Sequence, residues 1–405
     1  MIYGLLIIAI TWGISLSIIN NYQSKHPKID LNFLKNLIPY HLFLSFAYYL
    51  YAVFNPSDSQ YYYKKILYNF RGPEWMDFYG TSTTFIEWIG YPFVKWFGFS
   101  YEAMMALFSF FGMLGFIYFY LFFKERIKFN HSFFGFDLVT LFFLLPNLHF
   151  WSGSFGKGSI IFFGIGLFFY GLNNIKGRWK ILLLAGLLIY HIRPHIMFVM
   201  LISAIIGFTF SNKGVTTGMK IGVIIIAAGA FAFIYQDVLA MVGIEQGEEI
   251  ASGLNLDHRA AELAKATSGI DISSYSLPLQ VFTFLYRPLF FDAPGMLGLI
   301  VSFENVFLLA VTIMFFAKGG LKYLFTGDFT VKTAFLSFIT VSIALAQISG
   351  NLGIAIRQKS QVMLLFLFII VKMLDDKKMK AAYAVWKEKQ RKARMKAQME
   401  AMKVE

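Results

Sequence analysis

Long apolar runs separated by short polar connections recur along the whole chain. A helix that crosses a bilayer needs about 20 predominantly apolar residues, and most of these runs reach or approach that length. They predict eleven spans, at about residues 2–20, 38–54, 99–123, 135–152, 158–174, 179–192, 194–211, 220–244, 297–316, 330–348 and 360–374. We therefore expect an all-α polytopic membrane protein whose transmembrane domain covers residues 1–374.

The composition supports this reading and removes several kinds of chemistry. The chain is 57% hydrophobic, only 15% charged, and has a mean hydropathy of +0.60. A soluble domain would carry about 25% charged residues. The chain holds no cysteine, which excludes disulfides, thiolate catalysis and cysteine-ligated metals.

Lysine and arginine predict the orientation of the chain. Of the 36 basic residues, 25 fall in alternate loops on one face or in the C-terminal tail. Cytoplasmic loops carry the excess of basic residues, so residues 375–405 are predicted to form a basic cytoplasmic helix. The odd number of spans then places the N-terminus outside. The tail and this bias explain most of the net charge of +13; we expect the tail to meet anionic lipids or a protein partner, not nucleic acid.

Two long loops lie on the predicted outer face, at 55–98 and 245–296. The stretch 85–97 carries aromatic and apolar side chains on one side, as an interfacial helix does. Residues 247–267 also read as an amphipathic helix. Pro278 can begin another helix, which would run to Tyr286.

Five outer basic residues lie at membrane boundaries: Lys157, Arg193, Arg287, Arg357 and Lys359. The positive-inside bias disfavours them there, so another cause must hold them. Guanidinium groups match phosphate oxygens with two parallel hydrogen bonds, which makes a pyrophosphate at the outer headgroup level a natural ligand. The alternative is that each neutralises a nearby carboxylate or a lipid headgroup.

The stretch 190–195 places His191, Arg193 and His195 between two apolar segments. Such groups are costly in hydrocarbon and must face water, protein or an anionic ligand. Two histidines four residues apart can ligate zinc on a helix, but Pro194 separates them and no third ligand is evident, so no metal is expected. The segment 152–159 does not fit the P-loop pattern, so no nucleotide cofactor is expected.

Polar and aromatic residues of the outer face complete the candidate site. Asp58 follows the second span and could act as a general base toward a sugar hydroxyl. Its alternative role is an Asx turn that caps the segment after Pro56. Tyr61, Tyr62 and Trp151 could stack on sugar rings, although most aromatic residues of such a chain pack in the core or face lipid.

Several blocks of this sequence are similar to those of bacterial O-antigen and exopolysaccharide polymerases (Wzy-type and EpsG-type). These families combine about ten to fourteen spans with an Asp-x-x-x-Tyr-like element in an outer loop and arginines at outer helix ends. The blocks are Asp58 with Tyr62, Pro146-Asn147 through Lys157, Arg193-Pro194-His195, Arg287-Pro288, and Asn351-Leu352-Gly353 through Arg357-Gln358-Lys359.

The resemblance implies a GT-C-like membrane glycosyltransferase of the bacterial inner membrane. Such an enzyme would join undecaprenyl-pyrophosphate-linked glycan units at the outer leaflet, without nucleotide sugar or metal. The five basic residues would hold the donor pyrophosphate, and Asp58 or His195 would orient or deprotonate the attacking hydroxyl. Two alternatives stay open: a lipid-glycan flippase or transporter, and a structural subunit of an envelope machine.

Overall fold

The computed structural model describes residues 2–25, 30–210, 275–293, 295–349 and 351–401, with a few positions between 216 and 272. About 82% of the described residues are helical, and they include almost no sheet. The expected span at 220–244 and the expected amphipathic helix at 247–267 lie outside the described residues, apart from isolated positions.

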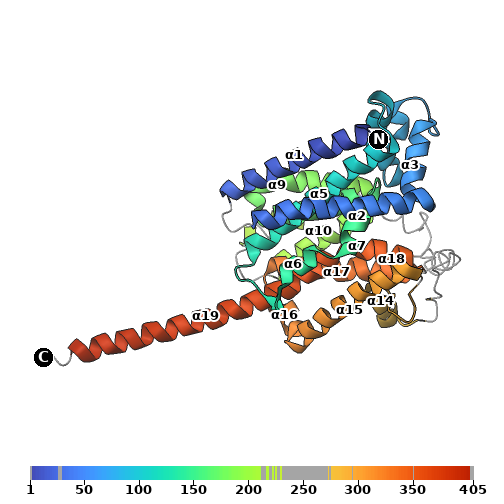
Figure 1. The fold of residues 1–405 in the computed structure, drawn as a ribbon. Coiled ribbons are helices and arrows are strands. Elements are labelled where there is room, and N and C mark those ends of the chain that lie inside the picture. Colours follow the sequence, from blue (N-terminus) through green and yellow to red (C-terminus); the bar gives the residue numbers. More distant parts are fainter. Residues whose placement is uncertain are drawn as a thin grey trace.

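The first half of the chain forms long helices joined by short ones (Figure 1). Its helices and strands are α1 (Ile2–Lys25), α2 (Leu31–Phe54), α3 (Asp58–Leu67), η1 (Trp75–Phe78), α4 (Thr83–Tyr91), η2 (Pro92–Trp96), α5 (Tyr101–Arg126), β1 (Ser132–Phe133), β2 (Phe136–Asp137), α6 (Leu138–Phe143), α7 (Pro146–Ser152) and α8 (Lys157–Leu172). The strands pair antiparallel, with Phe133 opposite Phe136. The interfacial helix expected at 85–97 is α4 continued by the π-helical turn η2.

The second half is also helical. Its elements are α9 (Ile175–Ile192), α10 (Pro194–Thr209), α14 (Leu277–Tyr286), α15 (Gly295–Ala317), α16 (Gly320–Thr326), α17 (Phe329–Ile348), α18 (Leu352–Lys359) and α19 (Met363–Ala401). Helix α14 occupies the stretch that Pro278 was expected to begin. Helix α19 joins the last expected span and the expected tail helix into one element.

Five described helices are long and apolar enough to cross a membrane, and the count rises to six if α18 and α19 form one broken span. They are Tyr3–Gln23, Leu31–Phe54, Tyr101–Arg126, Gly295–Ala317 and Phe329–Gln347. The expected count of eleven is therefore not confirmed. Helices α8 and α10 have 16 residues each, or about 24 Å of length against a hydrocarbon core of about 30 Å. The chain is a helical membrane protein.

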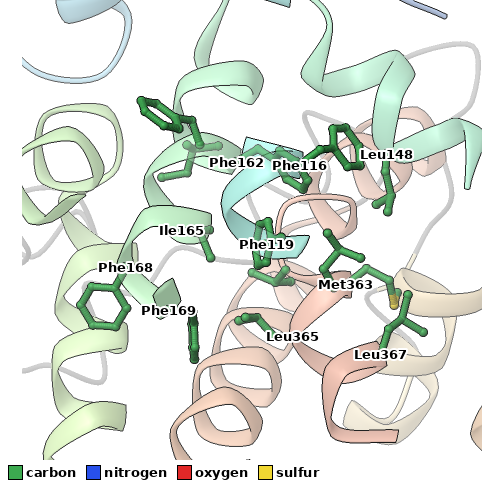
Figure 2. Packing of buried hydrophobic residues seen from close by; sticks show 14 of the residues in the cluster. Phe116, Phe119, Leu148, Phe162, Ile165, Phe168, Phe169, Met363, Leu365 and Leu367 are labelled. Carbon is green, nitrogen blue, oxygen red and sulfur yellow. The ribbon is translucent and has the colours of Figure 1, made fainter. Parts of the chain in front are cut away.

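The core lies where α5, α8 and α19 meet. Figure 2 shows Phe116 and Phe119 of α5 facing Phe162, Ile165 and other side chains of α8, with Met363, Leu365 and Leu367 of α19 alongside. A Cβ on Gly166 would lie 2.9 Å from the Gly115 carbonyl oxygen. Glycine at this position lets the two backbones approach closely, and close packing is what joins helices in lipid.

The expected span 135–152 is two short helices, α6 and α7, that break before Pro146. Proline has no N–H and disfavours helical geometry in the preceding residue. Backbone groups near a break need other partners inside a membrane protein. The Tyr40 hydroxyl donates to the Leu144 carbonyl at 2.7 Å, and the Asn147 N–H donates to the Glu304 carboxylate at 3.0 Å. Side chains of α2 and α15 therefore fix the position of α7.

The two ends of the helix bundle differ (Figure 1). The N-terminus lies near α3 at one end, which we call the α3 end. Helix α19 leaves the bundle at the opposite end and projects well beyond it, and its residues from Lys377 onward are mostly exposed. Helix α18 comes just before α19 in the chain, and the two helices meet at a bend of 52°. Helix α18 lies at the α3 end.

Candidate functional site

Asp58 and Arg357 form an ion pair at the α3 end. The Arg357 Nη1 donates to the Asp58 Oδ2 at 2.6 Å, although 299 positions separate the two residues in sequence. The N-cap of α3 is Ser57, whose hydroxyl accepts from the Gln60 N–H. Asp58 therefore pairs across the bundle rather than capping its own helix. Its side chain is 53% exposed and that of Arg357 is 24% exposed, so the pair borders solvent.

Aromatic side chains hold Arg357 in place from α7 and α3. The Arg357 guanidinium carbon lies 5.9 Å from the centre of the Trp151 ring, and Trp151 packs edge-on against Tyr48. A cation over an indole face is an attractive contact. Tyr62 of α3 is buried beside the pair; burial first, and then the negative charge of Asp58, raise its pKa to about 12. In this structure the Trp151 ring therefore contacts the Arg357 guanidinium.

Arg193 lies between α9 and α10, close enough to Arg357 for their charges to act on each other. Burial and the positive charge of Arg357 lower the pKa of Arg193 to about 10, which leaves the guanidinium charged at neutral pH. Within the described residues, no carboxylate forms an ion pair with Arg193. This arrangement brings a second positive charge close to Arg357.

Lys157 adds a third positive charge from the first turn of α8. Burial, followed by the charges of Arg193 and Arg357, lowers its pKa to about 8. Its Nζ donates to the Ser82 hydroxyl at 2.9 Å. A Cβ on Gly158 would lie 2.6 Å from the Trp151 carbonyl oxygen, so glycine is needed for this tight loop. We call Lys157, Arg193 and Arg357 the cation cluster.

The other two predicted phosphate ligands have partners of their own. Arg287 ends α14 and forms an ion pair with Asp292, and its Nη1 lies 3.5 Å from the Tyr275 hydroxyl. Lys359 is 1% exposed. Its Nζ donates to the Asn305 Oδ1 at 2.5 Å and to the Leu285 carbonyl at 3.0 Å. Arg287 thus neutralises a nearby carboxylate, which was the alternative to binding phosphate, and Lys359 donates to protein oxygens.

The remaining predicted residues are placed as follows. His195 lies in the first turn of α10 and is half-buried. Its role in orienting or deprotonating the attacking hydroxyl stays a prediction. Tyr61 is 55% exposed and lies under the Lys65 ammonium at 4.3 Å. Tyr62 is only 3% exposed, so its ring offers no open face to a sugar. Only Tyr61 of the two presents a ring to solvent.

Sequence reasoning missed the support that surrounds Lys157. Ser82 accepts the lysine and has a positive φ of 63°. Its N–H donates to the His191 carbonyl at 2.6 Å, and the His191 ring stacks on Phe85 at 4.6 Å. The run of small polar residues from Gly80 to Thr84 was the one available signal, because such a run favours a turn with unusual backbone angles.

Comparisons of the chain with protein-family models, with curated proteins and with solved structures found no match. The geometry therefore defines the class of site by itself. It is a cluster of three cations at one end of a membrane helix bundle, bordered by the partly exposed pair of Asp58 and Arg357 and by the Trp151 ring. Such a site suits a phosphorylated ligand.

Proposed function

We propose that this chain is a membrane glycosyltransferase that joins polyprenyl-pyrophosphate-linked glycan units, as the O-antigen and exopolysaccharide polymerases do. The observation that carries the proposal is the cation cluster beside Asp58. Three positive charges from separate segments lie close together; Arg357 pairs with the half-exposed Asp58, and the charges of Asp58 and Glu87 act on Lys157. A group of cations beside a partly exposed ion pair suits a pyrophosphate better than a neutral ligand.

In this proposal the donor is attached to the site through its pyrophosphate. The bond between the anomeric carbon and the phosphate oxygen breaks, and its electron pair stays on the pyrophosphate. The cation cluster stabilises the negative charge that develops there. A hydroxyl of the acceptor glycan forms the new bond to the anomeric carbon and gives its proton to a base. The leaving group supplies the driving force, so no nucleotide is required.

Asp58 is the proposed base, and its pairing with Arg357 suggests how substrate prepares it. In the structure, Arg357 pairs with Asp58 at 2.6 Å. When a pyrophosphate engages Arg357, the carboxylate is released to accept the proton of the attacking hydroxyl. Binding of the donor would thereby create the base that activates the acceptor.

The proposal includes an orientation in the bacterial inner membrane. The α3 end would face the periplasm, because the strongly basic tail of α19 leaves from the opposite end and basic segments stay cytoplasmic. The N-terminus would then be periplasmic and the tail free to meet anionic lipids or a protein partner. Accessibility labelling of single cysteines introduced at Lys64 and Lys389 in intact cells tests this orientation, since the chain has no native cysteine.

The experiment that tests the function is a glycan gel from a deletion strain complemented with wild type, Arg357→Gln, Arg193→Gln or Asp58→Asn. We expect each variant to accumulate single repeat units and to lose long chains at normal protein level. Lys64→Gln is the matched control, because Lys64 is an exposed cation of α3 outside the cation cluster. Long chains of normal abundance in all three site variants would refute the proposal.

A transporter or flippase of lipid-linked glycans is the second candidate, favoured by one observation. Glu304 and Lys359 are buried, and Lys359 ends the first part of the broken pair α18 and α19. Buried ionisable groups and broken helices are typical of transporters. Purified protein in liposomes separates the two functions. A transferase lengthens lipid-linked glycans without moving them between leaflets, and a flippase moves them without forming a bond.

A further inference from the structure

Two histidines meet inside the bundle, away from the cation cluster. His41 of α2 and His149 of α7 are 1% and 0% exposed. Their Nδ1 atoms lie 3.0 Å apart, which is the distance of a hydrogen bond between nitrogens. A hydrogen bond there needs a proton on one of the two atoms, so the protonation of the pair can be worked out from its other contacts.

The outer nitrogen of each ring faces a backbone carbonyl. The His41 Nε2 lies 2.9 Å from the Ser109 oxygen, and the His149 Nε2 lies 2.7 Å from the Phe143 oxygen. A carbonyl oxygen can only accept, so both Nε2 atoms must carry a proton. In two neutral rings the Nδ1 atoms would then be bare, and two lone pairs would face each other at 3.0 Å. One additional proton between them completes every contact.

The surroundings of the pair suit one shared proton. Phe116 of α5 lies flat on the His149 ring, with centroids 3.8 Å apart and planes 6° apart, and an aromatic face attracts a cation. A cavity of about 10 Å³ lined by Ser15 of α1, His41 and Ser109 of α5 adjoins the pair. This is about the room that one water needs, so a proton can reach the rings.

Two other titratable side chains near the pair, Tyr40 and Glu304, form hydrogen bonds with the backbone where α7 begins. Tyr40 of α2 places its ring edge against His149 and donates its hydroxyl to Leu144. Glu304 of α15 accepts the Asn147 N–H, two residues before His149. From α1 and α5 the neighbours are hydroxyls and aromatic rings. Within the described residues, no group of three or more histidine, aspartate or glutamate side chains can hold a metal ion.

We propose that His41 and His149 form a binding site for a single proton, shared between their Nδ1 atoms, that fastens α7 to α2. Helix α7 also carries Trp151, and the loop after it leads to Lys157. Release of the shared proton would place two lone pairs in contact and loosen α7. The inference rests on the two rings alone and holds whether or not the chain transfers glycans.

The first test counts protons on the four ring nitrogens. Full-length protein with ¹⁵N-labelled histidine is studied in lipid nanodiscs by nitrogen NMR near neutral pH. We expect three protonated nitrogens in the pair, and a coupling across the hydrogen bond that joins the two Nδ1 atoms. Two protonated nitrogens without the coupling, or four protonated nitrogens, would overturn the proposal. The wild-type protein is sufficient for this measurement.

The second test replaces the shared proton by a permanent donor. In His149→Asn the side-chain amide can donate to the His41 Nδ1 without an additional proton, so that contact no longer titrates. We expect the melting temperature of wild type to fall by about 2 °C or more as the pH rises from about 7 to about 10, and that of His149→Asn to fall less. Lys157 titrates in both proteins and cancels in the comparison.

His131→Asn is the matched control, because His131 contacts Asp375, away from the pair. It should keep the pH dependence of wild type. If His149→Asn does not fold, His41→Asn makes the same exchange from the other ring. Equal pH dependence in wild type and in the asparagine variant would contradict a shared proton. If neither asparagine variant folds, the proton count in the wild-type protein decides the question.

Discussion

Two groups of cations were predicted from the same sequence signature, and the structure treats them differently. Lys157, Arg193 and Arg357 lie close enough for their charges to act on one another, and Asp58 pairs with Arg357. Arg287 and Lys359 have local partners, in Asp292 for the arginine and in Asn305 and a carbonyl for the lysine. Arg357 has a carboxylate partner as well, but it belongs to a group of three cations, whereas Arg287 pairs with Asp292 outside that group. A basic residue at a helix end is therefore a stronger ligand candidate where the fold brings several cations together.

The comparison predicts its largest effect at Lys359. Lys359→Met would leave Asn305 and the Leu285 carbonyl without their donor and the charge of Glu304 without its counter-charge. Breaking a buried charged contact of this kind costs about 3–5 kcal/mol. We expect a large loss of thermal stability in detergent. Arg193→Gln should lose about 1 kcal/mol or less, because among the described residues no carboxylate is left without an ion-pair partner. Similar losses in the two variants would remove the distinction between the groups.

The second largest effect concerns activity at the Asp58–Arg357 pair. Arg357→Gln should lower the rate of glycan transfer by about 10²–10³-fold, as the loss of one group that stabilises a developing anion does. Arg287→Gln should lower it much less, since Arg287 lies outside the cation cluster and pairs with Asp292. Rates from purified enzyme and lipid-linked donor measure both. If the Arg287 variant were as inactive as the Arg357 variant, Arg287 would also have to be a ligand of the pyrophosphate.

The pH dependence of the site sharpens the comparison further. The pKa of Lys157 is lowered to about 8 by burial and by its two arginine neighbours. The lysine is charged below this pH and neutral above it, so kcat/KM should fall as the pH rises through about 8. Lys157→Arg should keep its charge and move the fall to higher pH. An unchanged profile in Lys157→Arg would exclude Lys157 as its cause.

The smallest predicted effect is at Trp151. Trp151→Leu keeps the apolar volume but removes the ring over which Arg357 lies. A cation–aromatic contact is worth about 0.5–1 kcal/mol at a partly exposed position. This loss corresponds to about two- to fivefold in donor affinity. A fluorescence titration with a polyprenyl pyrophosphate measures it. A loss above tenfold would indicate that Trp151 contacts the ligand itself.

The sequence predicted many residues of this site but not how they are arranged in space. Asp58, Lys157, Arg193 and Arg357 stood out because charge at the end of an apolar run needs a reason. That they meet depends on the packing of three helices, α3, α8 and α18, and of the junction between α9 and α10, all far apart in the chain, and the sequence holds no signal for that packing. Asp292, five residues after Arg287, could have revealed the local pair. Asn305 could not, because 54 positions separate it from Lys359.

The sequence likewise predicted some parts of the fold, such as the long helices, but not the contacts between them. Apolar runs located the long helices α2, α5, α15 and α17, because composition alone decides whether a helix is stable in lipid. The break between α6 and α7 follows from Pro146, which sits in the middle of the expected span 135–152. The contact of His41 with His149 had no sequence signal, since His41 lies within an ordinary apolar run and only tertiary packing gives it a partner.

The measurement that tests the central claim most directly is binding of inorganic pyrophosphate to the purified protein in nanodiscs, by calorimetry at low salt. We predict that Arg193→Gln and Arg357→Gln each weaken binding at least tenfold, while Arg287→Gln stays within about threefold of wild type. Equal affinities for wild type and all three variants would show that the cation cluster is not a pyrophosphate site and would contradict the account.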